Sequence, residues 1–432
     1  MPAQRTPGTG QLHSLTGVRF IAALMVFLFH IIYEAPFENG SVAHWYDRCF
    51  NQAGRTGVAF FFVLSGFVLS WSARPEGTVG RFWQRRLTKV FPNHLITYLA
   101  AIILTLAAGL SLGGWKFLPG LLLIQSWFPQ PDIETSANPV AWSLSCEIFF
   151  YLCFPFLLRA ISRINARHLW YWAGAVAGLV WCVPLIGRII LPARPVASWA
   201  PSVSTYEFWF VYVFPPTRML EFILGMLMAR ILLSGQWIRL PLSVAALLAL
   251  GVYVVAPEAP DIYSVVAVTV IPIALLVPAA AVLDLEERRS LLSSRVMLRL
   301  GELSFAFYLW HRLVLSFGHR ALGITEQWPT WEVAVLAALA FAVVVALSWL
   351  TFTFVEQPAM RWIGGRTGRS PVRQHMPVPV DATMPVARQQ QAPDRARLIR
   401  IATFPVSTTP VPRRPAYYFT SSWSTPHAIL LA

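Results

Sequence analysis

The sequence predicts an all-α membrane protein, a polytopic bundle of about ten transmembrane helices followed by a disordered C-terminal tail. Of the 432 residues, 56% are hydrophobic and only 12% are charged, whereas soluble globular domains carry about 25% charged residues. Apolar runs recur along most of the chain, and many approach the roughly 20 residues that cross a bilayer. Residues 363–432 lack such runs and are rich in Pro, Arg, Gln, Ser and Thr, a composition typical of disorder.

The apolar runs place the spans in order along the chain. We expect them at about 15–33, 57–72, 92–112, 145–163, 168–190, 214–234, 241–256, 265–283, 299–318 and 331–356. The stretch 114–128 is also apolar, but Pro119 and Gly120 interrupt it. Because broken backbone at membrane depth must be buried by other helices, we expect a re-entrant or interfacial piece there.

Loop charges predict the orientation. The connections after the second, fourth and eighth spans are basic, whereas 129–141 and 257–264 carry only acidic charges. Since basic loops face the cytoplasm, we expect a plasma-membrane protein with both termini in the cytoplasm. The net charge of +14 is then an orientation signal and does not indicate nucleic-acid binding.

Three regions follow from these patterns: a cytoplasmic N-terminal segment 1–12, a membrane domain 13–362 and a disordered cytoplasmic tail 363–432. The cysteines show neither disulfide nor zinc spacing, so we expect free thiols and no metal site. They are Cys49, Cys146, Cys153 and Cys182.

The first span, "LTGVRFIAALMVFLFHI", contains two polar side chains, Arg19 and His30. Eleven residues at 3.6 per turn place both on one helix face, about 16 Å apart. Arg19 could simply extend to the interface, and His30 could be a packing residue. The shared face favours a functional cavity, in which a histidine suits a general base that takes a proton from a hydroxyl.

The segment "RFWQRRLTKVFPNH", residues 81–94, concentrates positive charge beside a span. Its basic residues could serve topology alone. They could also bind the phosphates of a cytosolic cofactor, because guanidinium groups pair with phosphate oxygens. The residues concerned are Arg81, Arg85, Arg86 and Lys89.

Further polar residues lie in later spans. Glu147, in "NPVAWSLSCEIFFY", is one turn inside an apolar run at the predicted outer mouth of the fourth span and needs a partner there. Arg218 and Glu221 are three residues apart, which is typical of a structural ion pair. Ser304, Tyr308 and His311 share a helix face; hydrogen bonds between helices would explain them as well as catalysis would.

Several function classes lack support. The sequence has no G-x-S-x-G, P-loop, G-x-G-x-x-G or H-E-x-x-H motif. A transporter or flippase of a small polar molecule stays open as an alternative, because buried charges in a helix bundle would also serve transport. Internal repeats would favour a transporter, and none is evident.

Taken together, these blocks resemble the acyltransferase 3 family of integral-membrane O-acyltransferases. The resemblance covers roughly residues 13–362. It rests on Arg19-x10-His30, "GVAFFFVLSGFVLS" (57–70), the basic segment 81–89, "WSLSCEIFFY" (142–151), "RMLEFILGM" (218–226), "LGELSFAFYLWH" (300–311) and "FVEQPAMR" (354–361).

The resemblance implies transfer of an acyl group, commonly acetyl, from cytosolic acyl-CoA to a hydroxyl, with acyl-CoA as co-substrate and no permanently bound cofactor. His30 would be the catalytic histidine and Arg19 would support it, with Glu147 and His311 as further catalytic candidates. Thr16 replaces an acidic residue that the family often has there. The basic segment would hold the CoA phosphates through Arg81, Arg85, Arg86 and Lys89.

The variant with Thr16 is similar to a branch of macrolide acyltransferases, so the implied acceptor is a secondary metabolite such as a macrolide or its sugar, or a cell-surface glycan. We expect no fused extracytoplasmic module, so the membrane domain completes the reaction or a separate transferase partner does. The predicted outer loops, 34–56 and 188–213, hold aromatic residues that suit acceptor stacking or an interfacial belt: Trp45, Tyr46, Trp199 and Tyr206.

Overall fold

The computed structural model describes residues 12–34, 36–73, 78–197, 200–288, 290–323 and 326–366. The chain divides into two units, 1–371 and 372–432, and every described residue belongs to the first. The predicted N-terminal segment up to residue 11, Trp199 and the predicted tail beyond residue 366 lie outside the described residues.

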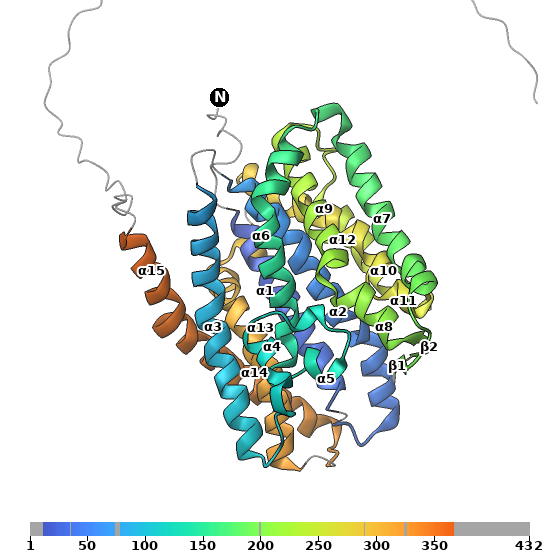
Figure 1. Ribbon diagram of the computed structural model, residues 1–432, viewed down its shortest axis with the longest axis vertical. Helices are drawn as coiled ribbons and strands as arrows, with labels where there is room; N and C mark the ends of the chain where they lie inside the picture. Colours follow the sequence, from blue (N-terminus) through green and yellow to red (C-terminus); the bar gives the residue numbers. More distant parts are fainter. Residues whose placement is uncertain are drawn as a thin grey trace, which may run out of the picture. The chain divides into compact units, whose positions relative to one another are not determined.

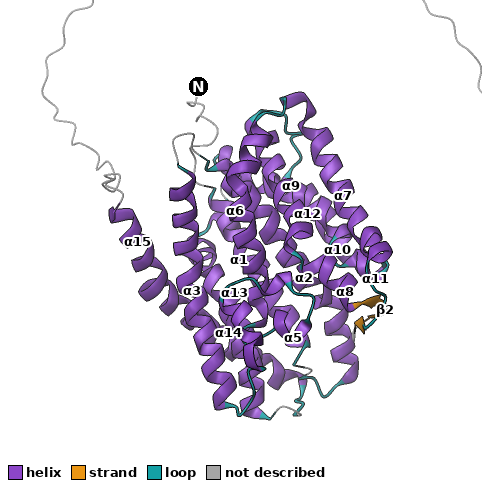
Figure 2. Cartoon of the chain, in the orientation of Figure 1, coloured by secondary structure: helices purple, strands orange, loops and turns teal. Residues whose placement is uncertain are grey.

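The described part is almost entirely helical (Figures 1 and 2). Its long helices are α1 (His13–Ile32), α2 (Gly40–Trp71), α3 (Val79–Ala107), α6 (Trp142–Ser162), α7 (Leu169–Ile190), α9 (Pro215–Leu233), α10 (Leu242–Val255), α12 (Ala267–Leu285), α13 (Arg295–Leu322), α14 (Thr330–Thr351) and α15 (Gln357–Arg366).

Shorter elements connect them. The single-turn α-helices are α4 (Leu118–Leu121), α5 (Pro131–Glu134), α8 (Thr205–Phe208) and α11 (Asp261–Ser264). The 3₁₀ turns are η1 (Gly114–Phe117), η2 (Gln125–Trp127), η3 (Pro139–Ala141), η4 (Ala166–His168), η6 (Ala256–Glu258) and η7 (Leu291–Ser293). Two π-helical turns are η5 (Trp209–Val213) and η8 (Phe352–Glu356), and β1 (Val196–Ala197) pairs antiparallel with β2 (Ala200–Ser204).

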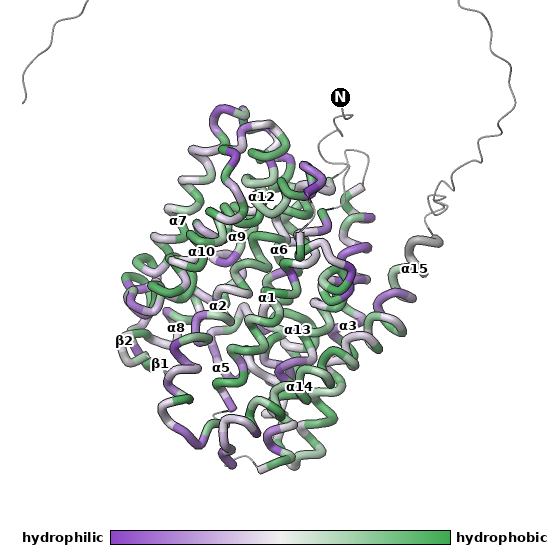
Figure 3. Tube along the Cα trace, turned by 180° about the vertical axis from the view of Figure 1, so that it is seen from behind, coloured by the Kyte–Doolittle hydropathy of each residue, from purple (hydrophilic) through white to green (hydrophobic). Residues whose placement is uncertain are grey.

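The predicted all-α membrane bundle is confirmed. A long helix occupies each of the ten expected positions, and within the described ranges seven helices are long and apolar enough to cross a membrane. Figure 3 shows hydrophobic green along the helices and hydrophilic purple concentrated in the connections at their ends. Three of the ten expected spans do not meet this length and hydropathy criterion: α9, α10 and α13. Helix α10 has 14 residues, fewer than a full span needs, α9 carries the buried pair Arg218 and Glu221, and α13 carries several charged residues, most of them exposed.

Two predicted loops are wrong. Helix α2 begins at Gly40, where the Asn39 side chain accepts hydrogen bonds from the first turn, so most of 34–56 is helical. Helix α3 begins at Val79 and continues through Pro92, so the basic segment 81–94 is helical. Hydropathy indicates which part of a helix lies in the membrane, but backbone hydrogen bonds can extend the helix beyond that part. A proline inside a helix is tolerated where neighbouring groups compensate.

Small residues bring the central helices close together. A Cβ on Gly66 of α2 would lie 1.9 Å from the Phe222 carbonyl oxygen, and one on Gly225 of α9 would lie 1.9 Å from the Val63 oxygen. Such reciprocal close contacts are typical of packing between membrane helices. Helix α1 packs against both α2 and α13, so its polar face lies at the centre of the described part.

The interrupted apolar segment 114–128 does not form a spanning helix. It folds into η1, α4 and η2 against α3, where the Tyr98 hydroxyl donates to the Phe117 carbonyl oxygen at 2.5 Å. The His94 ring contacts the Leu121 carbonyl oxygen at 3.2 Å. Side chains of α3 thus cover backbone groups that the interruption exposes.

Candidate active site

His30 lies in the last turn of α1, and neighbouring groups contact its ring on several sides. Its Nδ1 lies 2.8 Å from the Val26 carbonyl oxygen and 3.2 Å from Nε2 of His311 on α13. Phe29 packs edge-on against the His30 ring, and Tyr33 stacks on it with ring centroids 5.7 Å apart. The imidazole is therefore fixed in orientation, although His30 remains only half-buried.

These contacts define the tautomers of two neutral imidazoles. A carbonyl oxygen only accepts hydrogen bonds, so Nδ1 of His30 carries the proton that faces Val26, and Nδ1 of His311 carries the proton that faces the Tyr308 oxygen at 2.6 Å. Nε2 of His311 then holds a lone pair that accepts from His30 Nδ1. Nε2 of His30 is left with a free lone pair, the state that a general base requires.

Arg19 lines a small inner cavity deeper in the bundle. The cavity has a volume of about 40 Å³ and is bounded by Arg19, Glu147, Ser304 and Tyr308, with Phe62 among its apolar residues. This volume holds only one or a few water molecules. Tyr308 joins the cavity to the histidine pair, because its side chain lines the cavity and its carbonyl accepts from His311. The predicted face of Ser304, Tyr308 and His311 therefore faces the site.

Glu147 lies with Arg19 rather than at the outer mouth beside His30. Its carboxylate interacts electrostatically with Arg19, Lys89 and Arg86. The reason is the packing of α6 against α3, which opposes the first turns of α6 to the basic part of α3. The partner that a buried carboxylate needs is thus supplied by three cations.

The predicted basic cluster is divided between two faces of α3. Arg81 and Arg85 are exposed, whereas Arg86 and Lys89 are half-buried and turn toward Glu147. Arg86 Nε is buried, and no described residue forms a hydrogen bond with it. One turn further along α3, Asn93 Nδ2 donates to Glu356 Oε2 at 2.6 Å. Of the four predicted basic residues, only Arg86 and Lys89 therefore face the polar interior of the bundle.

Comparison with known proteins shows the family of this chain. A protein-family profile described as Acyltransferase domain (Acyl_transf_3) matches residues 12–352. The chain belongs to the acyltransferase 3 family. It is an O-acyltransferase of the membrane, as the resemblance implied. No solved structure matches it.

Several curated relatives align with this acyltransferase. "Acyltransferase MdmB" of Streptomyces mycarofaciens is 42% identical over 369 residues, covering 83% of this chain and 94% of the relative. "Nodulation protein 10" of Rhizobium leguminosarum bv. viciae is 27% identical over 332 residues, covering 71% and 82%. SACOL0978 of Staphylococcus aureus (strain COL), whose name proposes O-acetyl transfer, is 21% identical; the alignment covers 80% of this chain and 56% of that protein.

Arg218 and Glu221 of the acyltransferase form the ion pair that their spacing predicted, and the pair is buried. Arg218 Nη2 lies 3.0 Å from Glu221 Oε2, and both side chains are almost completely inaccessible. The guanidinium lies 5.0 Å from the ring centroids of both Phe62 and Tyr212. The pair thus packs behind Phe62 and does not line the inner cavity.

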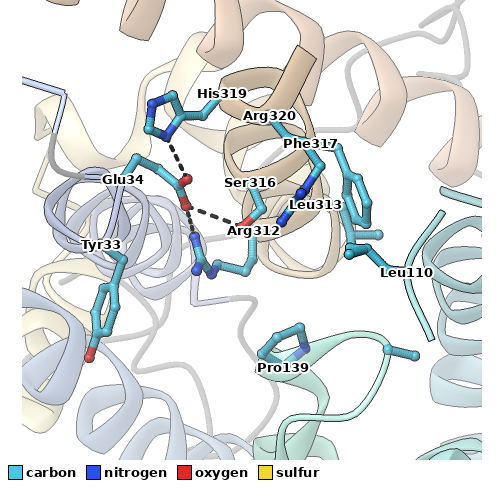
Figure 4. A pocket seen from close by; sticks show the side chains of 11 residues that line it. Tyr33, Glu34, Leu110, Pro139, Arg312, Leu313, Ser316, Phe317, His319 and Arg320 are labelled. Carbon is cyan, nitrogen blue, oxygen red and sulfur yellow. Dashed lines mark hydrogen bonds and ion pairs between the residues drawn. The ribbon is translucent and has the colours of Figure 1, made fainter. Parts of the chain in front are cut away.

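Sequence reasoning missed a second polar cluster of the acyltransferase, next to His30. The Glu34 carboxylate accepts hydrogen bonds from Arg312, Ser316 and His319 of α13 (Figure 4). The signal was present: Glu34 follows His30 by one helical turn, and Arg312 and His319 are seven apart on one face of α13. It was overlooked because these residues lie where hydropathy predicts a loop or a span end.

Proposed function

We propose that this acyltransferase moves an acyl group, acetyl in the simplest case, from cytosolic acyl-CoA to a hydroxyl of an acceptor molecule. The acceptor is a secondary metabolite such as a macrolide or its sugar, or a cell-surface glycan. The protein would lie in the plasma membrane with both termini in the cytoplasm. The observation that carries the proposal is that His30 Nδ1 contacts the Val26 carbonyl oxygen and His311 Nε2, which leaves His30 Nε2 as the nitrogen that can act as a base.

The proposed reaction needs one base. His30 Nε2 removes the proton from the acceptor hydroxyl, and the oxygen attacks the carbonyl carbon of the thioester. The tetrahedral intermediate collapses to the ester, the carbon–sulfur bond breaks, and the CoA thiolate takes the proton back from His30. The His311 lone pair stabilises the imidazolium by accepting from its Nδ1.

The donor would enter along α3. Arg86 and Lys89 face the interior, and the unpartnered Nε of Arg86 supports a role in binding the phosphates of CoA. Arg81 and Arg85 add positive charge on the exposed face. The pantetheine arm is longer than the inner cavity beside Arg19 allows, so its passage requires those side chains to move apart.

The test uses membranes that contain wild type or His30→Ala, supplied with radiolabelled acetyl-CoA and pooled macrolide and glycan acceptors. We expect transfer of label by wild type and a loss of about 100-fold or more in His30→Ala, the contribution of general base catalysis. His168→Ala, which replaces an exposed histidine of η4, is the matched control. Equal CoA turnover in wild type and His30→Ala would contradict the proposal and favour the transporter.

A further inference from the structure

A cavity of about 450 Å³ lies at the end of α1, where it meets α13. It is separate from the small cavity around Arg19, because the two share no residue. Its size is that of sites for small molecules, which range from roughly 300 to 1,000 Å³. Nothing in the reaction proposed above uses this cavity.

One wall of this outer cavity is polar. Glu34 accepts from Arg312 and Ser316 through Oε1 and from His319 through Oε2, the latter two at 3.1 Å (Figure 4). Arg312 has five N–H donors, and among the described residues only its Nη1 is seen to pair with a carboxylate, that of Glu34. A wall that combines a carboxylate, a guanidinium, a hydroxyl and an imidazole can both donate to and accept from hydroxyl groups.

The rest of the lining is mainly apolar, apart from Arg320 beside Phe317. Its apolar residues are Leu110, Ala137, Pro139, Leu313 and Phe317, and Figure 4 shows Leu110 and Pro139 across the cavity from Glu34. A ligand that fills this space has one apolar face and one edge that bears hydroxyls. A linear glycan strand has hydroxyl groups along both edges and only small C–H faces, so in this space some of its hydroxyls would lie against the apolar part without hydrogen-bond partners.

Tyr33 connects the outer cavity with the catalytic histidine. Its ring lines the cavity, stacks on the His30 ring and lies 5.6 Å from the Arg312 guanidinium carbon. Tyr33 is 61% exposed, so a ligand can reach it. His30 itself does not line the cavity, so a ligand hydroxyl would reach its imidazole past the edge of the Tyr33 ring.

From this geometry we infer that the outer cavity is the acceptor site, and that it takes a compact amphipathic molecule whose hydroxyls bind Glu34 and Arg312. The inference rests on the proposed function and deepens it, because it chooses between the two kinds of acceptor. Glu34 and Arg312 would determine acceptor affinity. They would not determine donor affinity, since the basic face of α3 lies elsewhere.

The experiment measures steady-state kinetics of the full chain in membranes with acetyl-CoA and two acceptor probes, a hydroxylated macrolactone and linear dextran. We expect transfer to the macrolactone. Glu34→Gln should raise the KM for the macrolactone about tenfold, the loss of one charge-assisted hydrogen bond, and leave the KM for acetyl-CoA within about twofold. Phe317→Trp, which fills the apolar part, should raise the same KM without touching the ion pair.

The matched control is Glu302→Gln, which removes a carboxylate on the same helix that pairs with Arg299 and does not line the cavity. A fall in kcat alone, an equal rise in both KM values, or transfer to dextran but not to the macrolactone would overturn the inference while leaving the acyltransferase function in place. CoA turnover that is equal in wild type and His30→Ala would instead contradict the proposed function itself.

Discussion

Nε2 of His311 lies 3.2 Å from Nδ1 of His30, although the two histidines are 281 residues apart in the chain. The contact joins the last turn of α1 to the middle of α13 and gives a second acceptor to the Nδ1–H of His30 that faces the Val26 carbonyl oxygen. His311 therefore acts on the reaction through His30, as a positioning residue.

Replacing His311 tests this relationship. His311→Leu removes the second acceptor of the His30 Nδ1–H and leaves only the Val26 carbonyl oxygen, so the imidazolium loses one partner; we expect kcat to fall about 10- to 100-fold, the value of one hydrogen bond to a charged group. His311→Gln retains an oxygen that can accept and should keep several times more activity than the leucine variant. The measurement is kcat for acetyl transfer, with KM for acetyl-CoA expected to stay constant. Equal losses in both variants would argue for a packing role.

The division of the basic residues on α3 gives a second prediction. Arg86→Ala and Lys89→Ala remove charges that face Glu147, so each should raise the KM for acetyl-CoA by about 5- to 20-fold, the value of one or two charge-assisted hydrogen bonds. Arg81→Ala and Arg85→Ala, on the exposed face, are the matched controls and should change it less than about threefold. The KM for acetyl-CoA is also measured at increasing salt concentration. Salt screens the exposed charges of Arg81 and Arg85 more than those of Arg86 and Lys89, so any contribution of the exposed pair is lost first. A larger effect of Arg81→Ala and Arg85→Ala would instead place the CoA phosphates on the exposed face of α3.

The crossing of α2 and α9 gives a prediction about stability. A side chain at Gly66 or Gly225 meets a backbone oxygen of the other helix at 1.9 Å, so Gly66→Leu or Gly225→Leu must push the helices apart. We expect a loss of several kcal/mol, within the range for overpacked cores, seen as a lower melting temperature in detergent. Gly174→Leu on α7, which has open space around it, should have little effect. A normal melting temperature for Gly66→Leu would show that the helices cross further apart.

The outer segment around α5 gives a prediction about pH. Burial raises the pKa of Glu134 from its ordinary 4.5 to about 7. Below pH 4.5 the carboxyl is protonated in both the folded and the unfolded chain. Between pH 4.5 and 7 only the unfolded chain ionises, so stability falls as pH rises through this window.

Glu134→Gln removes this penalty. We expect its melting temperature in detergent to match wild type near pH 4.5 and to exceed it by a few degrees at pH 8. Glu258→Gln, an exposed residue of η6, is the control and should follow wild type at both values. A Glu134→Gln variant that loses stability at pH 8 would show instead that the ionised carboxylate is paired.

Some of the structure could be predicted from local patterns alone. Hydropathy placed a long helix at all ten expected positions, because the length of an apolar run and the 3.6-residue period depend only on neighbouring residues. The same period put Arg19 and His30 on the polar face of α1. The prediction of helix starts from hydropathy was wrong for α2 and α3. These helices begin at Gly40 and Val79, in polar sequence that precedes the apolar run.

The sequence by itself determined the all-α membrane class, the family and the helix faces that carry Arg19, His30 and His311. Tertiary structure alone decided that His311 contacts His30, that Glu147 lies among Arg19, Arg86 and Lys89, and that Glu34 binds α13 beside an outer cavity. The physical reason is that contacts between helices depend on how closely and at what rotation the helices cross. That is set by reciprocal packing, such as the glycines of α2 and α9, and not by the pattern within any one segment.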